Sequence, residues 1–157
     1  MKLLIVRHGE PDYEHDSLTE KGWREAELLA DRLCRLNVKA FYMSPLGRAQ
    51  ATAKPTLERL GRQAEVLPWL HEFRGKVLDP MTGKDTISWD MMPKYWKNRP
   101  ELFDREAWRI NDLYATGNAG AIYDETAAGV DALLAKHGYV RDGGLYHSEA
   151  PNTDTIV

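Results

Sequence analysis

Residues 3–11, LLIVRHGEP, decide the fold class because an apolar run and a charged turn meet inside them. Four consecutive apolar residues, 3–6, favour a strand covered on both faces over a half-exposed strand, whose apolar side chains would alternate. Arg7 and His8 follow at once, so this strand delivers an arginine and a histidine to its own carboxyl end. In an open α/β sheet, that end borders the binding crevice.

Strand and helix patterns alternate along the next sixty residues. Helix patterns cover residues 17–36 and 44–61, and strand patterns cover residues 38–44 and 63–70. Strand, helix, strand, helix, strand is the order of an α/β domain with a mostly parallel central sheet. We therefore predict a three-layer α/β fold, with helices on both faces of the sheet, in a single domain.

Both helix patterns carry start signals. Ser17 and Glu20 have the spacing of a capping box, while Ser44 suits the N-cap and Pro45 the first position of the second helix. Pro55 should kink the second helix. The expected buried stripes consist of Trp23, Ala26, Ala30 and Leu33 in the first helix, and Leu46, Ala49, Ala53, Leu57 and Leu60 in the second.

The regular alternation breaks down over residues 75–120, which contain three prolines, four glycines and three tryptophans. We interpret this segment as an insertion over one end of the sheet, a lid or a pocket wall. A helix pattern returns at residues 121–138, and residues 142–144 suit the turn of a following hairpin. Residues 155–157 resemble the beginning of another buried strand.

Composition narrows the classes of function. The formal net charge is -3, so the chain lacks the excess of Lys and Arg that binding to nucleic acid or to an anionic membrane requires. Cys34 is the only cysteine, which excludes an intrachain disulfide and suits a reducing compartment. No apolar run approaches the ~20 residues of a membrane span, and the N-terminal run is too short for a signal peptide. We expect a cytoplasmic protein.

Several side chains at predicted strand ends converge on one crevice. Arg7, His8, Ser44 and Glu72 all follow strand patterns, and Arg48 lies one turn into the second helix. A cation near a helix N-terminus is unfavourable unless an anion binds nearby. Two arginines, a histidine and a helix N-terminus together predict a site for a doubly charged anion such as phosphate. Taken singly, an arginine or a histidine more often has a structural role, and for Arg7 and His8 position alone favours function and structure about equally.

Four segments in order along the first half of the chain carry a resemblance to a known family. They are LIVRHGEP, LTEKGWREAELLA, SPLGRAQATA and WLHEFRG. Together they resemble the histidine phosphatase superfamily, also called the phosphoglycerate mutase-like family. The resemblance implies a phosphoglycerate mutase-like α/β fold and an enzyme that hydrolyses small-molecule phosphomonoesters.

The same resemblance implies a role for each matching residue. His8 would be the nucleophile that forms a phosphohistidine, and Arg7 and Arg48 would hold the phosphoryl oxygens. Glu72 would be the general acid. Glu10 is either a support for His8 at the pocket rim or a solvated loop carboxylate. Neither a cofactor nor a metal is expected, since the five histidines show no paired ligand spacing.

Two departures from the family pattern leave alternatives open. The loop after residue 9 lacks the longer substrate motif of the mutases, which favours a phosphatase over a phosphotransferase. The family's second histidine, in a later His-Gly motif, has no match: His147 lies on the hairpin, and His137 suits a helix C-terminus, where a cation complements the dipole.

We therefore expect that the chain lacks the family's C-terminal strand and helix. The alternative to an enzyme is an anion-binding or catalytically impaired module, which the missing segment or a partner chain would complete. The sequence leaves the substrate and the oligomeric state open, a homo-oligomer included.

Overall fold

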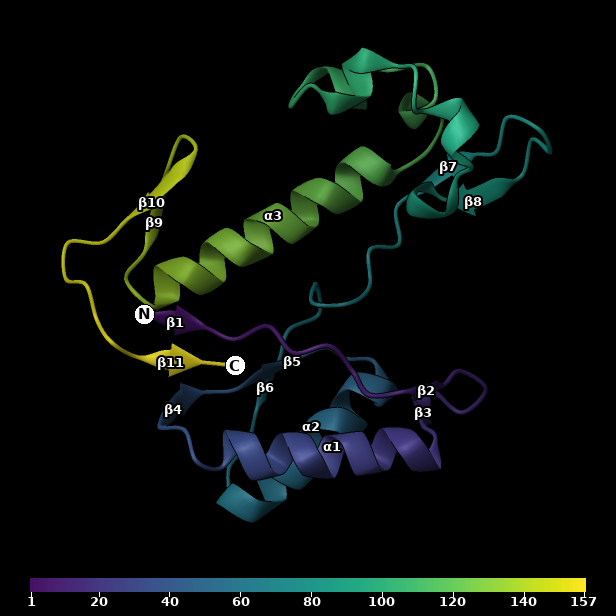
Figure 1. Cartoon of the computed structure of the whole chain (residues 1–157). Helices are drawn as coiled ribbons and strands as arrows, with labels where there is room; N and C mark the ends of the chain where they lie inside the picture. Colours follow the sequence, from purple (N-terminus) through teal and green to yellow (C-terminus); the bar gives the residue numbers. More distant parts are fainter. The chain divides into compact units, whose positions relative to one another are not determined.

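The computed structural model describes residues 1–157, which divide into two compact units (Figure 1). The first unit consists of Met1–His71 with Leu134–Val157, and the second unit is Glu72–Leu133. The second unit contains the whole segment that the sequence predicts as an insertion and extends past it at both ends. None of the helices has the length and apolar character that a membrane crossing demands.

A parallel sheet organises the first unit. Its order is β1 (Lys2–Leu3), β11 (Thr155–Ile156), β4 (Val38–Ala40), and both pairings are parallel. Figure 1 shows β11 between the other two strands, and the side chain of Ile156 is fully buried there. The prediction of a buried strand at residues 155–157 is confirmed, and so is the mixed α/β class with a parallel sheet.

Three shorter strand pairs complete the first unit. β5 (Tyr42–Met43) pairs in parallel with β6 (Glu65–Val66), as strands joined by a helical crossover do. The other two pairs are antiparallel hairpins, namely β2 (Pro11–Asp12) with β3 (Ser17–Leu18), and β9 (Val140–Asp142) with β10 (Leu145–His147). The β9–β10 hairpin confirms the turn predicted at residues 142–144.

The first strand is shorter and more exposed than the apolar run predicts. Only Lys2–Leu3 forms β1, and Ile5 is 89% exposed, so the expectation of a strand covered on both faces is wrong. The physical reason is position: β1 is an edge strand that pairs with β11 alone. A continuous apolar run indicates that a strand belongs to a buried sheet, but it does not show whether the strand lies at the edge of that sheet.

The N-cap of helix α1 (Glu20–Leu33) lies two residues later than predicted. Its N-cap is Thr19, whose hydroxyl accepts a hydrogen bond of 3.1 Å from the backbone N–H of Gly22. Ser17, the predicted cap, lies in β3 instead, because the chain is still paired with Asp12 at that point. The predicted buried stripe is largely confirmed, with Gly22 buried and Trp23 partly exposed.

Helix α2 (Gly47–Leu60) differs from the prediction in its start and in its buried face. Its N-cap is Leu46, and the Ser44 hydroxyl accepts a 3.2 Å hydrogen bond from the backbone N–H of Leu46, so the predicted cap lies two residues too early. The helix continues through Pro55. Its buried residues are Arg48, Thr52, Pro55 and Thr56. The leucine and alanine stripe is therefore wrong, since its members are only partly buried. A threonine can be buried in their place when its hydroxyl bonds within the helix, as that of Thr52 does to the carbonyl of Arg48.

The two helices lie side by side in Figure 1. Arg59 of α2 reaches two carboxylates of α1, with its Nη1 2.5 Å from Asp31 Oδ1 and its Nη2 paired with Glu27. These partly exposed ion pairs add specificity to the packing of α1 on α2 more than stability.

The second unit contains little regular structure before α3 (Ala119–Lys136), most of which belongs to it. That part holds one antiparallel hairpin, β7 (Lys76–Leu78) with β8 (Asp85–Ile87), and a series of short 3₁₀ turns. These turns are η1 (Ser88–Asp90), η2 (Pro93–Tyr95), η3 (Pro100–Phe103), η4 (Ala107–Arg109) and η5 (Tyr114–Thr116). The predicted loss of alternation is confirmed, whereas the role of this segment as a lid stays a prediction.

A small core of its own holds the second unit together. Its buried members are Val77, Met91, Leu113 and Ala119, the first residue of α3 (Ala119–Lys136). Two of the three tryptophans of this segment, Trp96 and Trp108, pack against the same core. Proline and glycine therefore set the path of the chain here, and aromatic side chains supply the buried area.

His137, just after α3, is held toward its neutral form. Its Nε2 lies 2.8 Å from the Tyr42 hydroxyl, which donates to it when the ring is neutral. Burial lowers the pKa of His137, and the charges of Lys39 and Lys136 lower it further. The predicted position of His137 at a helix C-terminus is confirmed, whereas burial and the charges of Lys39 and Lys136 oppose a cation there.

We predict an acid-sensitive contribution to stability from His137. Its pKa is lower when folded than the ordinary ~6.5, so the unfolded chain binds more protons and stability falls as pH drops from about 6.5 through the lowered value. His137→Gln keeps an acceptor for Tyr42 without titrating. Thermal unfolding at about pH 7.5 and about pH 5.5 should show a smaller loss in this variant than in the wild type. Equal acid sensitivity of wild type and His137→Gln would contradict the assignment.

Candidate active site

One chain of hydrogen bonds joins the two motifs that carry His8 and Arg48. The backbone N–H of Gly9 donates to Thr52 Oγ1 at 3.0 Å, and the Thr52 hydroxyl donates to the carbonyl of Arg48 at 2.8 Å. Thr52 is buried, so both bonds are sheltered from water. The segment after β1 and the first turn of α2 are therefore fixed to each other.

The same segment orients the imidazole of His8. Its Nδ1 lies 2.8 Å from the carbonyl oxygen of Gly9. Because a carbonyl can only accept, Nδ1 carries the proton when the ring is neutral, and Nε2 keeps its lone pair. This is the tautomer that a nucleophilic imidazole requires.

Close backbone contact seats the His8 segment on α1. A Cβ at Gly22 would lie 2.2 Å from the carbonyl oxygen of Glu10, and a Cβ at Gly9 would lie 2.8 Å from the carbonyl oxygen of Gly22. Only glycine permits this approach. The backbone N–H of Glu10 also donates to Glu25 Oε2 at 2.8 Å. The start of α1 therefore serves as the platform for the candidate nucleophile.

The Glu10 carboxylate is bound to the first turn of α1. It accepts hydrogen bonds from Lys21 Nζ at 2.6 Å and from Thr19 Oγ1 at 3.0 Å. Hydrogen bonding to Lys21 and to Thr19 holds the pKa of Glu10 below its ordinary value. Glu10 thus anchors the loop that carries His8, and its predicted supporting role at the pocket rim stays a prediction.

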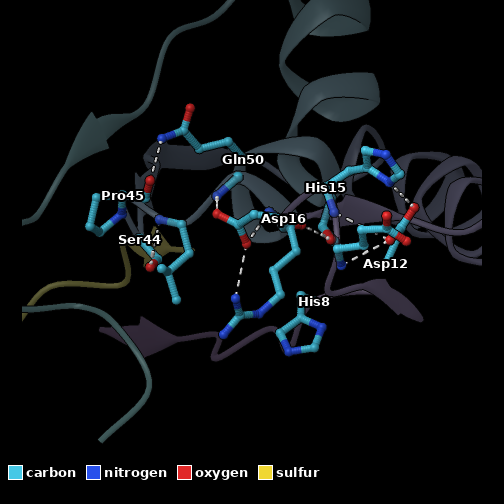
Figure 2. Close-up of polar contacts among 12 residues, drawn as sticks. His8, Asp12, His15, Asp16, Ser44, Pro45 and Gln50 are labelled. Atoms are coloured by element: carbon cyan, nitrogen blue, oxygen red, sulfur yellow. Dashed lines mark hydrogen bonds and ion pairs between the residues drawn. The ribbon is translucent and has the colours of Figure 1, made fainter. Parts of the chain in front are cut away.

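Asp16 supplies the anion that the position of Arg48 calls for. Arg48 is buried, and its Nη1 lies 2.9 Å from Asp16 Oδ1. Asp16 Oδ2 accepts from the backbone N–H of Gly47 at 2.6 Å, and Oδ1 has a further 3.4 Å contact with the backbone N–H of Arg48. Figure 2 shows dashed contacts converging on the Asp16 carboxylate.

This arrangement corrects one part of the predicted anion site. The N-terminus of α2 was expected to bind the external anion, but Asp16 and Ser44 already accept from the amides of Leu46, Gly47 and Arg48. The hydrogen bond from the Gly47 amide, and to a lesser extent the contacts with Arg48, hold the pKa of Asp16 below its ordinary value. The side chains, not the helix amides, must therefore supply the binding groups for an external anion.

Sequence reasoning missed Asp16 and Thr52. Asp16 lies in a loop that has no periodicity, and its partners are 31 and 32 positions away. The only sequence signal is the glycine at position 47, because glycine can mark a close approach of another segment. In the structure a Cβ at Gly47 would lie 2.2 Å from the carbonyl oxygen of Asp16. Thr52 stands four residues after Arg48, the spacing at which a hydroxyl reaches the carbonyl one turn earlier.

The structure brings together only some of the predicted residues. His8 and Arg48 are joined within the first unit, and Arg7 is exposed beside His8. Glu72 is the first residue of the second unit, and its side chain is exposed. The catalytic and phosphate-binding roles of these residues stay predictions.

We predict that Thr52→Val loosens the candidate site. Valine has the same shape but neither donates nor accepts, so the Gly9 N–H loses its acceptor and the Arg48 carbonyl loses a donor. The free energy of unfolding, measured in urea, should fall by about 1–2 kcal/mol. Thr52→Ser keeps the hydroxyl and is the matched control; equal losses in both variants would assign the effect to the methyl group.

Two curated relatives resemble the chain at the level of sequence. A 2,3-bisphosphoglycerate-dependent phosphoglycerate mutase from Thermoplasma acidophilum is 40% identical over 65 residues, which cover 34% of this chain and 32% of the mutase. Phosphoserine phosphatase 1 from Hydrogenobacter thermophilus is 26% identical over 148 residues, 87% of this chain and 66% of that protein. The chain thus spans at most 66% of the length of these relatives.

Solved structures share the fold. A mycobacterial hydrolase superposes with a TM-score of 0.52 at 23% identity, over 96% of this chain and 70% of that one. The native structure of a mycobacterial glucosyl-3-phosphoglycerate phosphatase superposes with a TM-score of 0.51 at 23% identity, over 96% and 69%. At this identity the likeness shows the fold alone.

The family assignment comes from the sequence as a whole. Residues 3–138 match the sequence model of the histidine phosphatase superfamily, branch 1, a range that includes every residue of the candidate site. The resemblance predicted from the four ordered motifs is confirmed. The chain belongs to branch 1 of the histidine phosphatase superfamily.

Proposed function

We propose that the protein hydrolyses a phosphomonoester through a phosphohistidine on His8. The observation that carries the proposal is the Gly9 carbonyl, which lies 2.8 Å from His8 Nδ1 and so favours an unprotonated Nε2. In the first step Nε2 attacks phosphorus in line, a P–N bond forms, and the bond from phosphorus to the leaving oxygen breaks. Water then attacks the phosphohistidine, which restores His8 and releases phosphate.

Arginine side chains would stabilise the charge of the transferring group. Arg48 is buried and fixed at the start of α2, and Arg7 directly precedes His8. Guanidinium groups bind phosphoryl oxygens with paired donors, so these two residues can supply charge that other phosphatases obtain from a metal. Glu72 would protonate the leaving oxygen and then take a proton from the attacking water.

A phosphatase is favoured over a mutase. The loop that follows His8 is a short hairpin, β2–β3, without room for the longer substrate loop that the mutases carry. The relative that aligns along 87% of the chain is named a phosphatase, whereas the mutase aligns along 34%. Transfer of the phosphoryl group to water is therefore the preferred outcome of the second step.

Binding without turnover is the second candidate function. Arg7, His8 and Arg48 belong to the first unit, while the proposed acid, Glu72, begins the second unit. An anion site can therefore form from the first unit alone. Since the chain spans at most 66% of its curated relatives, we propose hydrolysis for the whole protein.

We predict that His8→Ala abolishes hydrolysis of p-nitrophenyl phosphate, with a loss of at least about 10³-fold in kcat. The wild type should also form an acid-labile phosphoenzyme that ³¹P NMR detects as phosphohistidine and that His8→Ala lacks. His147→Ala removes an exposed histidine of β10 and should leave both readouts unchanged. Phosphate binding without any His8-dependent hydrolysis would favour the binding module instead.

Glu72→Gln tests the general acid separately. Alkyl phosphates have poor leaving groups, so their hydrolysis should slow by about 10²-fold or more, whereas p-nitrophenolate leaves without a proton and should be affected less. Glu149→Gln, at an exposed glutamate after β10, is the control. If Glu72→Gln slows both substrates equally, Glu72 does not protonate the leaving group.

A further inference from the structure

The β2–β3 hairpin places two side chains on Arg48. The carboxylate of Asp16 lies 2.9 Å from Nη1, and the ring of Tyr13 lies with its centroid 5.5 Å from the guanidinium carbon. One contact is a charged hydrogen bond and the other a cation–π contact. A single short hairpin therefore holds the guanidinium by its edge and against an aromatic ring.

The hairpin is itself braced from within. Asp12 accepts hydrogen bonds from the backbone N–H groups of Glu14 at 3.1 Å and His15 at 3.3 Å, and its other oxygen lies 2.8 Å from His15 Nδ1. Asp16 has a φ of 43°, in the left-handed region, where the chain reverses before it enters β3. Figure 2 shows Asp12, His15 and Asp16 in this one loop. The carboxylate of Asp16 thus lies on a constrained backbone.

The charge of Asp16 is already shared among several donors. Its oxygens meet Nη1 of Arg48 and the amides of Gly47 and Arg48, at the positive end of α2. The Arg48 side chain is 11% exposed and that of Asp16 45% exposed. A carboxylate that accepts several hydrogen bonds repels an incoming anion less than a solvated carboxylate does. It also restricts the rotation of the long Arg48 side chain.

We propose that Asp16, assisted by Tyr13, is a positioning residue that pre-orients Arg48 for a phosphoryl group. The proposal rests on the proposed function, in which Arg48 binds that group. Asp16 acts through Arg48 and does not contact the substrate. The competing possibility is that Asp16 occupies the place of the anion and must be displaced, and the sign of one measurement separates the two.

Asp16→Asn is the central variant because the amide keeps an oxygen for the Gly47 N–H and loses the charge that holds Arg48. Binding of inorganic phosphate, followed by calorimetry, should weaken by about 3- to 10-fold. Tyr13→Ala should weaken it less. Glu14→Gln lies on the same hairpin and is the control, which should bind as the wild type does. Tighter binding by Asp16→Asn would overturn the proposal and show that Asp16 competes with the anion.

A double-mutant cycle separates positioning from general stability. In an Arg48→Ala background, Asp16→Asn should cause no further loss of phosphate affinity, because there is no guanidinium left to orient. An equal loss in both backgrounds would assign Asp16 a structural role only and overturn the proposal. Thermal unfolding of each variant accompanies the measurement, so that loss of the fold is recognised.

The order of the Arg48 side chain gives a readout that needs no turnover. ¹⁵N relaxation of the Arg48 Nε–H group in the free protein should show a rigid side chain in the wild type and a mobile one in Asp16→Asn. Unchanged rigidity would contradict the clamp. A wild type that hydrolyses no phosphomonoester would count against the proposed function alone. Phosphate affinity and the order of the Arg48 side chain test its positioning by Asp16 independently.

Discussion

The candidate site depends on the buried hydroxyl of Thr52, which accepts from one motif and donates to another. Through Gly9 it fixes the segment that sets the tautomer of His8, and through the carbonyl of Arg48 it fixes the first turn of α2. A hydroxyl is suited to this task because it both accepts and donates within a small volume. A larger side chain would separate the two segments, and an apolar one would leave a peptide group without a partner.

At the start of α2, a carboxylate of the same chain balances the positive charge of the arginine and the helix N-terminus. A buried arginine beside a helix N-terminus adds positive charge to positive charge, which suggests an external anion. Here Asp16 meets the same demand, so the position of Arg48 does not by itself require a ligand. The assignment to a phosphatase family depends instead on the ordered motifs and on the orientation of His8.

Local patterns predicted much of the fold and less of the site. The alternation of elements, the hairpin turn at residues 142–144 and the buried strand at 155–157 depend on short-range signals, and they are confirmed. The helix caps were placed wrongly because residues such as Ser17 can serve in a strand as well as at a cap. Asp16 and the buried face of α2 could not be read from spacing, because contacts with distant segments decide them.

The sheet order has a consequence for how the first unit folds. β1 and β4 are not neighbours in the sheet, and both depend on β11 for their parallel pairing, although nearly the whole chain separates β11 from β1. Bringing such distant strands together costs loop-closure entropy before any pairing contact forms, and this cost slows folding. Packing of α1 on α2 involves shorter separations and can precede the sheet. A folding intermediate with paired helices and an unformed sheet would then expose Ile156, which is fully buried in the folded unit, to other chains.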